Sequence, residues 1–391
     1  MAGLYIHIPF CIKKCHYCDF YSLELNNKYD INSRRSSSPA VSRLIDNLCK
    51  EIELTTTQSN FKHEIDTVFI GGGTPSLLSK EELSSVLDQL NKYYTFKDDF
   101  EFTIECNPGT TNKEKIKDFI ELGVNRISFG IQSFIPGELE FLQRIHSADE
   151  AVKSIHEARD AGIENLSIDM IFAIPGQTIE SLNKSIDTAL SLQPDHISYY
   201  SLIYEEGTPL YKDMLNDKIA VIGEDEDAKF YEHVIDRMTE KGYKQYEVSN
   251  FAKDGKYCYH NLNYWHCGEY LAFGPSAHGF VERKRYKNFK SLKHYNESLA
   301  VNTLPIEHSE FITDENMITE LIMLGLRSDG INWKALKLNF SAYKYANADK
   351  LIDEFTAQRL IMNDQDKLRL SKSGYLLCDE IIVKILNEIN L

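Results

Sequence analysis

The sequence predicts an α/β protein whose first half is a partial (β/α)6 barrel. Six short runs rich in apolar and β-branched residues alternate with amphipathic stretches along the first half of the 391 residues. The residues that carry chemistry fall at or just after the ends of these runs, which is the edge where β/α barrels build their sites. Six repeats are fewer than a closed barrel needs, so a partial barrel is favoured, and a doubly wound sheet is the alternative.

The predicted strands share an apolar, β-branched composition and are separated by stretches long enough for crossover helices. Parallel strands require such crossovers, which are right-handed. The strands are expected at Leu4–Pro9, Asp66–Gly71, Phe100–Cys106, Arg126–Ile131, Asn165–Ile171 and His196–Ile203.

Helix-start and helix-stop signals mark the connections. Gly123 and Gly162 are placed to end two of the helices, because glycine tolerates the left-handed backbone of a helix C-terminus. Three hydroxyl residues are each followed three positions later by glutamate, as in a capping box. These pairs are Ser79 with Glu82, Thr111 with Glu114, and Ser147 with Glu150.

The alternation weakens after about residue 215, which divides the chain into three predicted parts. Residues 1–215 form the barrel, residues 216–304 a linking segment, and residues 305–391 a smaller C-terminal α+β unit that resembles a winged helix. The linking segment is expected to hold a helix near Asp225–Lys241 and a strand near Tyr243–Phe251.

Within the C-terminal unit, helices are expected near Thr313–Leu326 and Ala342–Gln358. The ribbon RLIMNDQDKLRLS follows, and a last helix begins near Gly374. In the barrel, the polar, serine-containing segment Asn26–Pro39 predicts a loop after the first strand.

Composition and charge limit the function classes. Lys and Arg total 43 against 59 Asp and Glu, for a formal charge of −16, which argues against nucleic-acid binding. The chain has no run of 18 apolar residues, so any membrane contact is expected to be peripheral. The start MAGLYIHIPFC lacks the features of a secretion signal, so a cytoplasmic location is expected, where eight cysteines do not form a disulfide framework.

Three of the cysteines form a CxxxCxxC motif at the start of the chain. Cys11, Cys15 and Cys18 lie in the run CIKKCHYC. Thiolates are the usual ligands of iron–sulfur clusters, and three of them leave one iron of a [4Fe–4S] cluster open for chemistry. A zinc site or unrelated free thiols are the alternatives, although zinc usually takes four ligands and CxxC pairs.

The run LYIHIPFCIKKCHYCDF resembles the start of the HemN/HemW branch of the radical S-adenosylmethionine (SAM) superfamily. The resemblance continues through IGGGTPS, IECNPG, RISFGIQSF, LSIDMIFAIPGQT and YCYHNLNYW. It implies a [4Fe–4S] cluster on the three cysteines and SAM chelated to the open iron.

The same resemblance implies which residues bind SAM. Gly72, Gly73 and Thr74 follow a strand, where glycine lets the backbone approach a ligand closely, and a tight turn is the alternative. Arg144 offers a planar fork for the carboxylate of SAM. The other positions that match the family's SAM site are Tyr5, Glu105, Gln132 and Asp169.

Two departures distinguish the relatives within this branch. The oxygen-independent coproporphyrinogen III oxidases have a fourth cysteine two residues after the third, where this chain has Phe20. They also carry a longer arm before the cysteines. Both departures resemble the HemW group of heme chaperones, which implies heme as ligand, together with heme-acceptor proteins and an electron donor.

The motif HNLNYW resembles the HNxxYW heme-binding motif of that group. His260 is a candidate axial ligand, and Tyr264 and Trp265 are candidates for contact with the porphyrin face. An aromatic-rich structural turn is an alternative, and zinc on nearby cysteines and histidines is another. Because the motif follows the six strand–helix units, it is expected on the flank of the barrel.

Two functions therefore compete. The first is a heme chaperone, and the second is an oxidase that decarboxylates the propionates of coproporphyrinogen III. Phe20, the short start and HNLNYW favour the chaperone. The sequence does not identify the heme acceptor, the electron donor or the oligomeric state.

Overall fold

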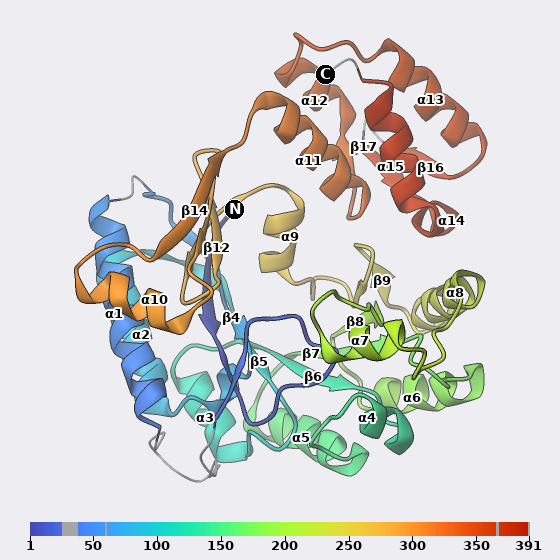
Figure 1. Cartoon of the computed structure of the whole chain (residues 1–391). Coiled ribbons are helices and arrows are strands. Elements are labelled where there is room, and N and C mark those ends of the chain that lie inside the picture. The colour runs from blue at the N-terminus through green and yellow to red at the C-terminus, as the bar shows by residue number, and fades with distance from the viewer. Residues whose placement is uncertain (26–37, 59–60, 365–366, 390–391) are drawn as a thin grey trace.

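A computed structural model describes residues 1–25, 38–58, 61–364 and 367–389 of the chain (Figure 1). Residues 26–37 of the loop predicted at 26–39 lie outside the described residues. So do residues 365–366 of the predicted C-terminal ribbon.

The six predicted strands are present, parallel and adjacent in chain order, so the predicted fold class is confirmed. Each observed strand lies within a few residues of its prediction. The strands are β1 (Ala2–Ile8), β4 (Ile65–Gly72), β5 (Phe96–Cys106), β6 (Arg126–Gln132), β7 (Asn165–Phe172) and β8 (His196–Ser201). Short elements near the cysteines and glycines are β2 (Phe10–Cys11), β3 (Leu23–Glu24) and the 3-10 helix η1 (Pro75–Leu77).

Helices cover the outside of these strands (Figure 1). The apolar faces of most of these helices and the outward side chains of the strands form one large hydrophobic core, and Phe141 and Leu210 pack in a smaller one. These helices are α1 (Pro39–Gln58), α2 (Lys80–Tyr93), α3 (Lys113–Glu121), α4 (Pro136–Phe141), α5 (Ala148–Ala161), α6 (Ile179–Ser191), α7 (Pro209–Leu215) and α8 (Glu224–Glu240).

Two of the three predicted capping boxes are confirmed, at Ser79 and Ser147. The prediction at Thr111 is wrong by one residue. Asn112 caps α3, and its side chain accepts a hydrogen bond from the backbone N–H of Lys115 at 2.9 Å. Asparagine is the stronger N-cap of the two neighbours, which accounts for the shift. Gly162 ends α5 in the left-handed conformation, as predicted.

The sheet continues beyond the six strands on both sides. On one side, β11 (Glu269–Phe273) pairs in parallel with β1. On the other side, the single strand predicted at 243–251 is wrong. The chain forms two short antiparallel strands there, β9 (Lys244–Gln245) and β10 (Asn250–Ala252). The sheet is completed by β12 (His278–Val281), β13 (Lys284–Asn288) and β14 (Ile306–Phe311), for twelve strands among the described residues.

The C-terminal unit has its own hydrophobic core, separate from that of the barrel. It lies next to α9 (Tyr259–Trp265), and its hairpin and helices agree with the predicted winged-helix-like arrangement (Figure 1). Its elements are α11 (Asp314–Leu326), β15 (Ile331–Asn332), α12 (Trp333–Asn339), α13 (Ala346–Ala357), β16 (Ile361–Asp364), β17 (Lys367–Leu370), α14 (Lys372–Leu376) and α15 (Cys378–Asn387). The exact boundaries of the three predicted parts stay a prediction.

Among the described residues, no helix is long and apolar enough to cross a membrane.

A buried carboxyl group joins α1 to the added strands and to α10 (Leu292–Ala300). Glu51 accepts hydrogen bonds from the backbone N–H of Gly274, the Tyr295 hydroxyl and the Asn288 amide. Burial outweighs these bonds and raises the pKa of Glu51 to about 7.

This pKa predicts a pH-dependent stability. Between pH 4.5 and 7 the folded carboxyl of Glu51 keeps a proton that the unfolded chain has lost, so stability falls as pH rises through this window, by roughly 3 kcal/mol. Glu51→Gln mimics the protonated form and should remove this component of the pH dependence. Urea unfolding of both proteins at pH 5 and pH 7.5 measures it, with exposed Glu53→Gln as the control. Equal pH dependence of wild type and Glu51→Gln would contradict the prediction.

Candidate functional site

The inner face of the barrel is polar. Along β6, the fully buried Ile127 and Phe129 alternate with Arg126 and Ser128, which line an internal cavity. In strands β7 and β8 as well, successive side chains point alternately to the core and to the cavity. A polar inner face cannot pack into a dry core, so it leaves room for a ligand.

This cavity has a volume of about 660 Å³ and runs through the barrel. The mouth is lined by residues after the cysteine motif and after β13, and the opposite end is closed by α9. The lining includes Tyr5, His7, Asp19, Phe20, Tyr21, Phe69, Glu105, Arg126, Ser128, Asp169, His196, Ser198, Tyr200, His260, Tyr264, Tyr270, His278, Lys287 and Lys290.

The three cysteines of the motif lie in β2 and the loop that follows it. The Thr74 hydroxyl contacts the sulfur of Cys11 at 3.5 Å, and Arg144 donates to the sulfur of Cys15 at 3.4 Å. Burial raises the pKa of Cys11, and it raises the pKa of Cys18 to about 11. Bound iron must therefore displace the thiol protons.

Two observations bear on what these thiols can hold. All three cysteines are free of disulfides. Among the described residues, no three His, Cys, Asp or Glu side chains are close enough to hold a single metal ion. The donor set itself fits a [4Fe–4S] cluster, because three thiolates bind three of the irons and leave the fourth open, whereas zinc usually takes four protein ligands in a structural site.

Arg144 connects the cysteine loop to the ends of β5 and β6. One terminal nitrogen donates to the side chain of Asn107 at 2.6 Å and to the carbonyl of Gly130 at 2.5 Å. Its Nε is buried and has no partner. This free donor beside Cys15 suits an anionic group bound next to the cysteines. Asn107 was not predicted, although ECNPG places it directly after a strand.

The glycines after β4 are required by the chain itself. An added Cβ on Gly72, where φ is +114°, would lie 2.6 Å from the ring of His7. On Gly73 it would lie 2.6 Å from the carbonyl of Phe10. The Gly72 N–H donates to Glu105 at 3.0 Å, and the Thr74 N–H donates to the Phe10 carbonyl at 2.7 Å. Close packing of the backbone therefore accounts for the glycines before any ligand is considered.

Glu105, Asp169 and Tyr5 face the cavity together. Burial, and then repulsion from Asp169, raises the pKa of Glu105 to about 8, so its carboxyl keeps a proton near neutral pH. The carboxylate of Asp169 accepts from Ser128 at 3.0 Å. The Tyr5 hydroxyl is hydrogen bonded to Nδ1 of His7 at 3.0 Å. These groups offer both donors and acceptors to a polar ligand.

Gln132 ends β6 with a φ of +73°, where the pairing with β7 shifts register. This backbone conformation is uncommon for a residue with a side chain, and such strain concentrates at functional sites. Gln132 thus lies at a strand end, as expected from the sequence, and its side chain, like those of Asn107 and Arg144, lies close to Gly130.

His260 lies inside the barrel, at the closed end of the cavity. Its side chain is fully buried and stacks on Phe69 at 5.2 Å between ring centroids. Its Nδ1 is 2.8 Å from the Thr67 hydroxyl, and its Nε2 is 2.7 Å from the Tyr264 hydroxyl. The expectation that HNLNYW lies on the flank of the barrel is wrong, because α9 enters at the end where strands begin.

A buried carboxylate holds α9 in this position. Glu101 accepts from the backbone N–H groups of Tyr259 and His260, each at 3.0 Å. These N–H groups belong to the first turn of α9, which lacks partners within the helix. Burial, and then repulsion from Arg126, lowers the pKa of His260 to about 3, so its imidazole is neutral at physiological pH.

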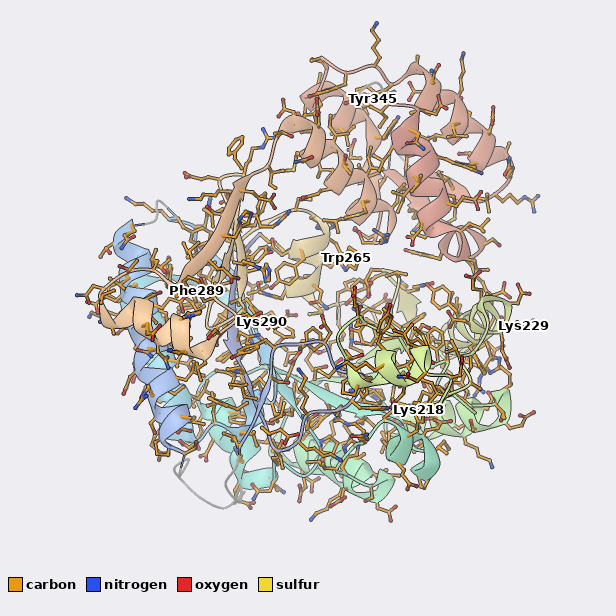
Figure 2. All side chains as sticks on the ribbon, in the orientation of Figure 1. Lys218, Lys229, Trp265, Phe289, Lys290 and Tyr345 are labelled. Carbon is orange, nitrogen blue, oxygen red and sulfur yellow. The ribbon has the colours of Figure 1, made fainter. Side chains whose placement is uncertain are left out.

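The two aromatic residues of the motif, Tyr264 and Trp265, lie in different surroundings. Tyr264 lines the cavity, and its ring meets Tyr270 edge-on at 4.5 Å. Trp265, labelled in Figure 2, is half-buried and packs in a small cluster with Tyr246, Ala252 and Leu262. It is absent from the described lining of the cavity.

The zinc alternative for this segment is not supported. Cys258 contacts Glu101, while His266 is hydrogen bonded to Asp329 in the C-terminal unit at 2.7 Å. Cys258, His260, His266 and Cys267 therefore do not converge on one point among the described residues.

Other cavity residues were missed by sequence reasoning. The signal that identifies them is alternation: polar residues two apart within an apolar strand mark the inner face of a barrel. This pattern would have found Arg126 and Ser128 in β6 and His196 and Ser198 in β8. No local signal identifies Glu101.

The fold and the site together define the radical SAM class of proteins, and comparisons agree. The family model for the radical SAM superfamily matches residues 5–189, and the model for the HemN C-terminal domain matches residues 312–377. The solved structure of coproporphyrinogen III oxidase (HemN) from Escherichia coli superposes with a TM-score of 0.82 at 20% identity, covering 98% of this chain and 89% of that one.

Two curated relatives match over the whole chain. Heme chaperone HemW of Bacillus subtilis is 37% identical over 100% of both proteins. The mitochondrial radical S-adenosyl methionine domain-containing protein 1 of Danio rerio is 33% identical over 100% of this chain and 88% of its own length. This chain belongs to the HemW family. Membership of the radical SAM superfamily implies a [4Fe–4S] cluster and SAM as cofactors.

Arg144 provides a direct test of the SAM site. Arg144→Ala should weaken SAM binding by about 1.5–3 kcal/mol, because a charged hydrogen bond is lost. Three thiolates remain, so iron content should be retained. Isothermal calorimetry with SAM on the reconstituted protein measures the effect, and exposed Arg43→Ala is the control. SAM affinity equal to wild type would show that Arg144 does not bind its carboxylate.

Proposed function

We propose that this protein is a heme chaperone, which binds heme in the barrel cavity and delivers it to acceptor proteins. The observation that carries the proposal is the state of His260. Its imidazole is neutral, faces the cavity, and has Nδ1 fixed by Thr67. A histidine ligand of this kind commonly donates its second ring N–H to a neighbour, which leaves the other nitrogen for the metal.

The hydroxyl of Tyr264 contacts Nε2 of His260, which is the ring nitrogen that the proposal assigns to the metal. With Nδ1–H donated to Thr67, the lone pair of Nε2 accepts from the Tyr264 hydroxyl at 2.7 Å. In the proposed complex, Nε2 of His260 would bind the heme iron in place of this hydroxyl, and the Tyr264 ring would supply apolar contact. We assign Trp265 to the support of α9, because it packs beside the helix.

The proposed cofactor site lies where the strands end: Cys15, Thr74 and Arg144 line a small pocket of their own, and Tyr5, Glu105 and Asp169 line the cavity. Cys11, Cys15 and Cys18 hold the [4Fe–4S] cluster, which supplies one-electron chemistry when SAM is bound. Arg144 orients the carboxylate of SAM, and the backbone of Gly72, Gly73 and Thr74 lies along its methionyl part. Around its adenosyl part we place Tyr5, Glu105, Gln132 and Asp169.

Phe20 favours the chaperone over the oxidase. It occupies the position of the oxidases' fourth cysteine, and its ring is 69% exposed at the mouth of the cavity. A phenyl ring cannot serve as a cluster ligand, but it offers an apolar surface to a porphyrin that enters or leaves. An electron donor and heme-acceptor proteins are the partners that this function requires.

One preparation tests the proposal. After anaerobic reconstitution of the cluster, the protein is titrated with heme and, separately, incubated with coproporphyrinogen III, SAM and a reductant. We expect stoichiometric heme binding, transfer of that heme to an apo-protein acceptor, and no multiple-turnover formation of protoporphyrinogen IX. Repeated turnover without heme binding would instead make the protein an oxidase.

A further inference from the structure

Arg126 is a buried cation that forms no side-chain hydrogen bond with the described residues. It begins β6, its side chain is 2% exposed, and it lines the cavity near the closed end. Its buried Nε has no hydrogen-bond partner among the described residues, and Glu101 and Asp169 act on it only through their charges. A guanidinium removed from water and left unpaired is costly, so the folded chain keeps this charge for something that binds there.

The acidic groups around Arg126 are engaged elsewhere. The carboxylate of Asp169 accepts side-chain hydrogen bonds from Ser128 and Ser198. The carboxylate of Glu101 accepts the N–H groups at the start of α9. Both carboxylates still attract the charge of Arg126, but neither forms a hydrogen bond with its guanidinium group.

We propose that Arg126 binds a carboxylate of the ligand in the cavity. This inference rests on the proposed function, under which that carboxylate is a heme propionate. The planar guanidinium matches a carboxylate through two parallel hydrogen bonds. Because the site is buried, solvent screens this pair little.

The lysines at the mouth are the competing anchor. Lys287 already pairs with Glu307 at 3.0 Å. Lys290, labelled in Figure 2, is exposed on the loop after β13. An exposed ammonium binds an anion weakly because water and salt screen it. Arg126 is therefore the stronger anchor, and the carboxylate of SAM is the other source of the same chemistry.

Heme and its dimethyl ester, in which both carboxylates are masked, separate these alternatives. Each is titrated into the reconstituted wild type and into Arg126→Gln, Arg126→Lys and Lys290→Gln, with SAM affinity measured in parallel. We expect the ester to bind wild type and Lys290→Gln roughly 10- to 100-fold more weakly than heme. In Arg126→Gln the ratio of heme affinity to ester affinity should fall to about threefold or less. Arg126→Lys should give a ratio between those of wild type and Arg126→Gln. Iron content and thermal midpoint check that each variant is folded.

Each other outcome overturns the inference. If the ester penalty persists in Arg126→Gln, or disappears in Lys290→Gln, the carboxylates are bound at the mouth. If Arg126→Gln loses SAM affinity and keeps the ester penalty, Arg126 serves SAM. If wild type binds heme and ester equally, the inference fails while the proposed function stands, whereas absence of heme binding by wild type overturns both.

Discussion

Replacement of any one of Cys11, Cys15 and Cys18 by alanine is expected to abolish cluster assembly. Each variant loses one of the three thiolates of the motif, and the other five cysteines lie elsewhere in the chain. Two thiolates do not retain a four-iron cluster that already has one open iron. Iron and sulfide per chain after anaerobic reconstitution, with the visible absorption spectrum, measure the effect.

Cys49→Ala is the matched control for these variants. Cys49 is half-buried on α1, and its thiol contacts the carbonyl of Ser85 at 3.5 Å, away from the motif. It should therefore assemble the cluster as wild type does. Near-normal iron in all three motif variants would refute the cluster assignment, and loss of iron in Cys49→Ala as well would indicate general instability of the fold.

Local sequence patterns predicted the barrel well because the barrel is built from repeated local units. Each strand before a helix has an apolar outward face that must pack on that helix, so composition and spacing reveal it. The capping boxes at Ser79 and Ser147 were predictable for the same reason, since their partners lie three residues away. The family resemblance, carried by the cysteine motif and the motifs after it, is confirmed.

The closed end of the cavity was not predictable, because its contacts join distant parts of the chain. His260 meets Thr67, which lies 193 residues earlier, and α9 is held by Glu101, which lies 158 residues before Tyr259. No periodicity in either segment records these pairs. The parallel pairing of β11 with β1 brings the chain back to the start of the barrel, and this pairing delivers α9 to the cavity.

The burial of His260 gives its replacement a large expected effect. His260→Ala should lower heme affinity by about 100-fold or more and shift the Soret band, because even the loss of a group that only orients a metal ligand typically costs 10- to 100-fold. Iron–sulfur content should be unchanged, since none of the three cysteines is among the described residues that line the cavity with His260. Heme titration followed by absorption spectroscopy gives both readouts.

Tyr264→Phe tests the geometry more sharply, because the change is expected to act in the opposite direction. It keeps the ring against Tyr270 and removes the hydroxyl that, in the proposed tautomer, donates to Nε2 of His260. Heme then no longer has to displace a hydrogen bond of about 1 kcal/mol, so its affinity should rise roughly fivefold. A fall in affinity would mean that the Tyr264 hydroxyl itself contacts the heme.

His266→Ala and Cys267→Ala complete the series, because both residues follow the motif directly. His266 is bound to Asp329 in the C-terminal unit, and burial raises the pKa of Cys267 to about 12, so neither is poised as a ligand in the cavity. Both variants should bind heme as wild type does. If His260→Ala keeps the wild-type spectrum and affinity while one of these variants does not, the axial ligand lies elsewhere in the segment. If all three bind heme normally, HNLNYW only closes the barrel, and the heme is held by other residues.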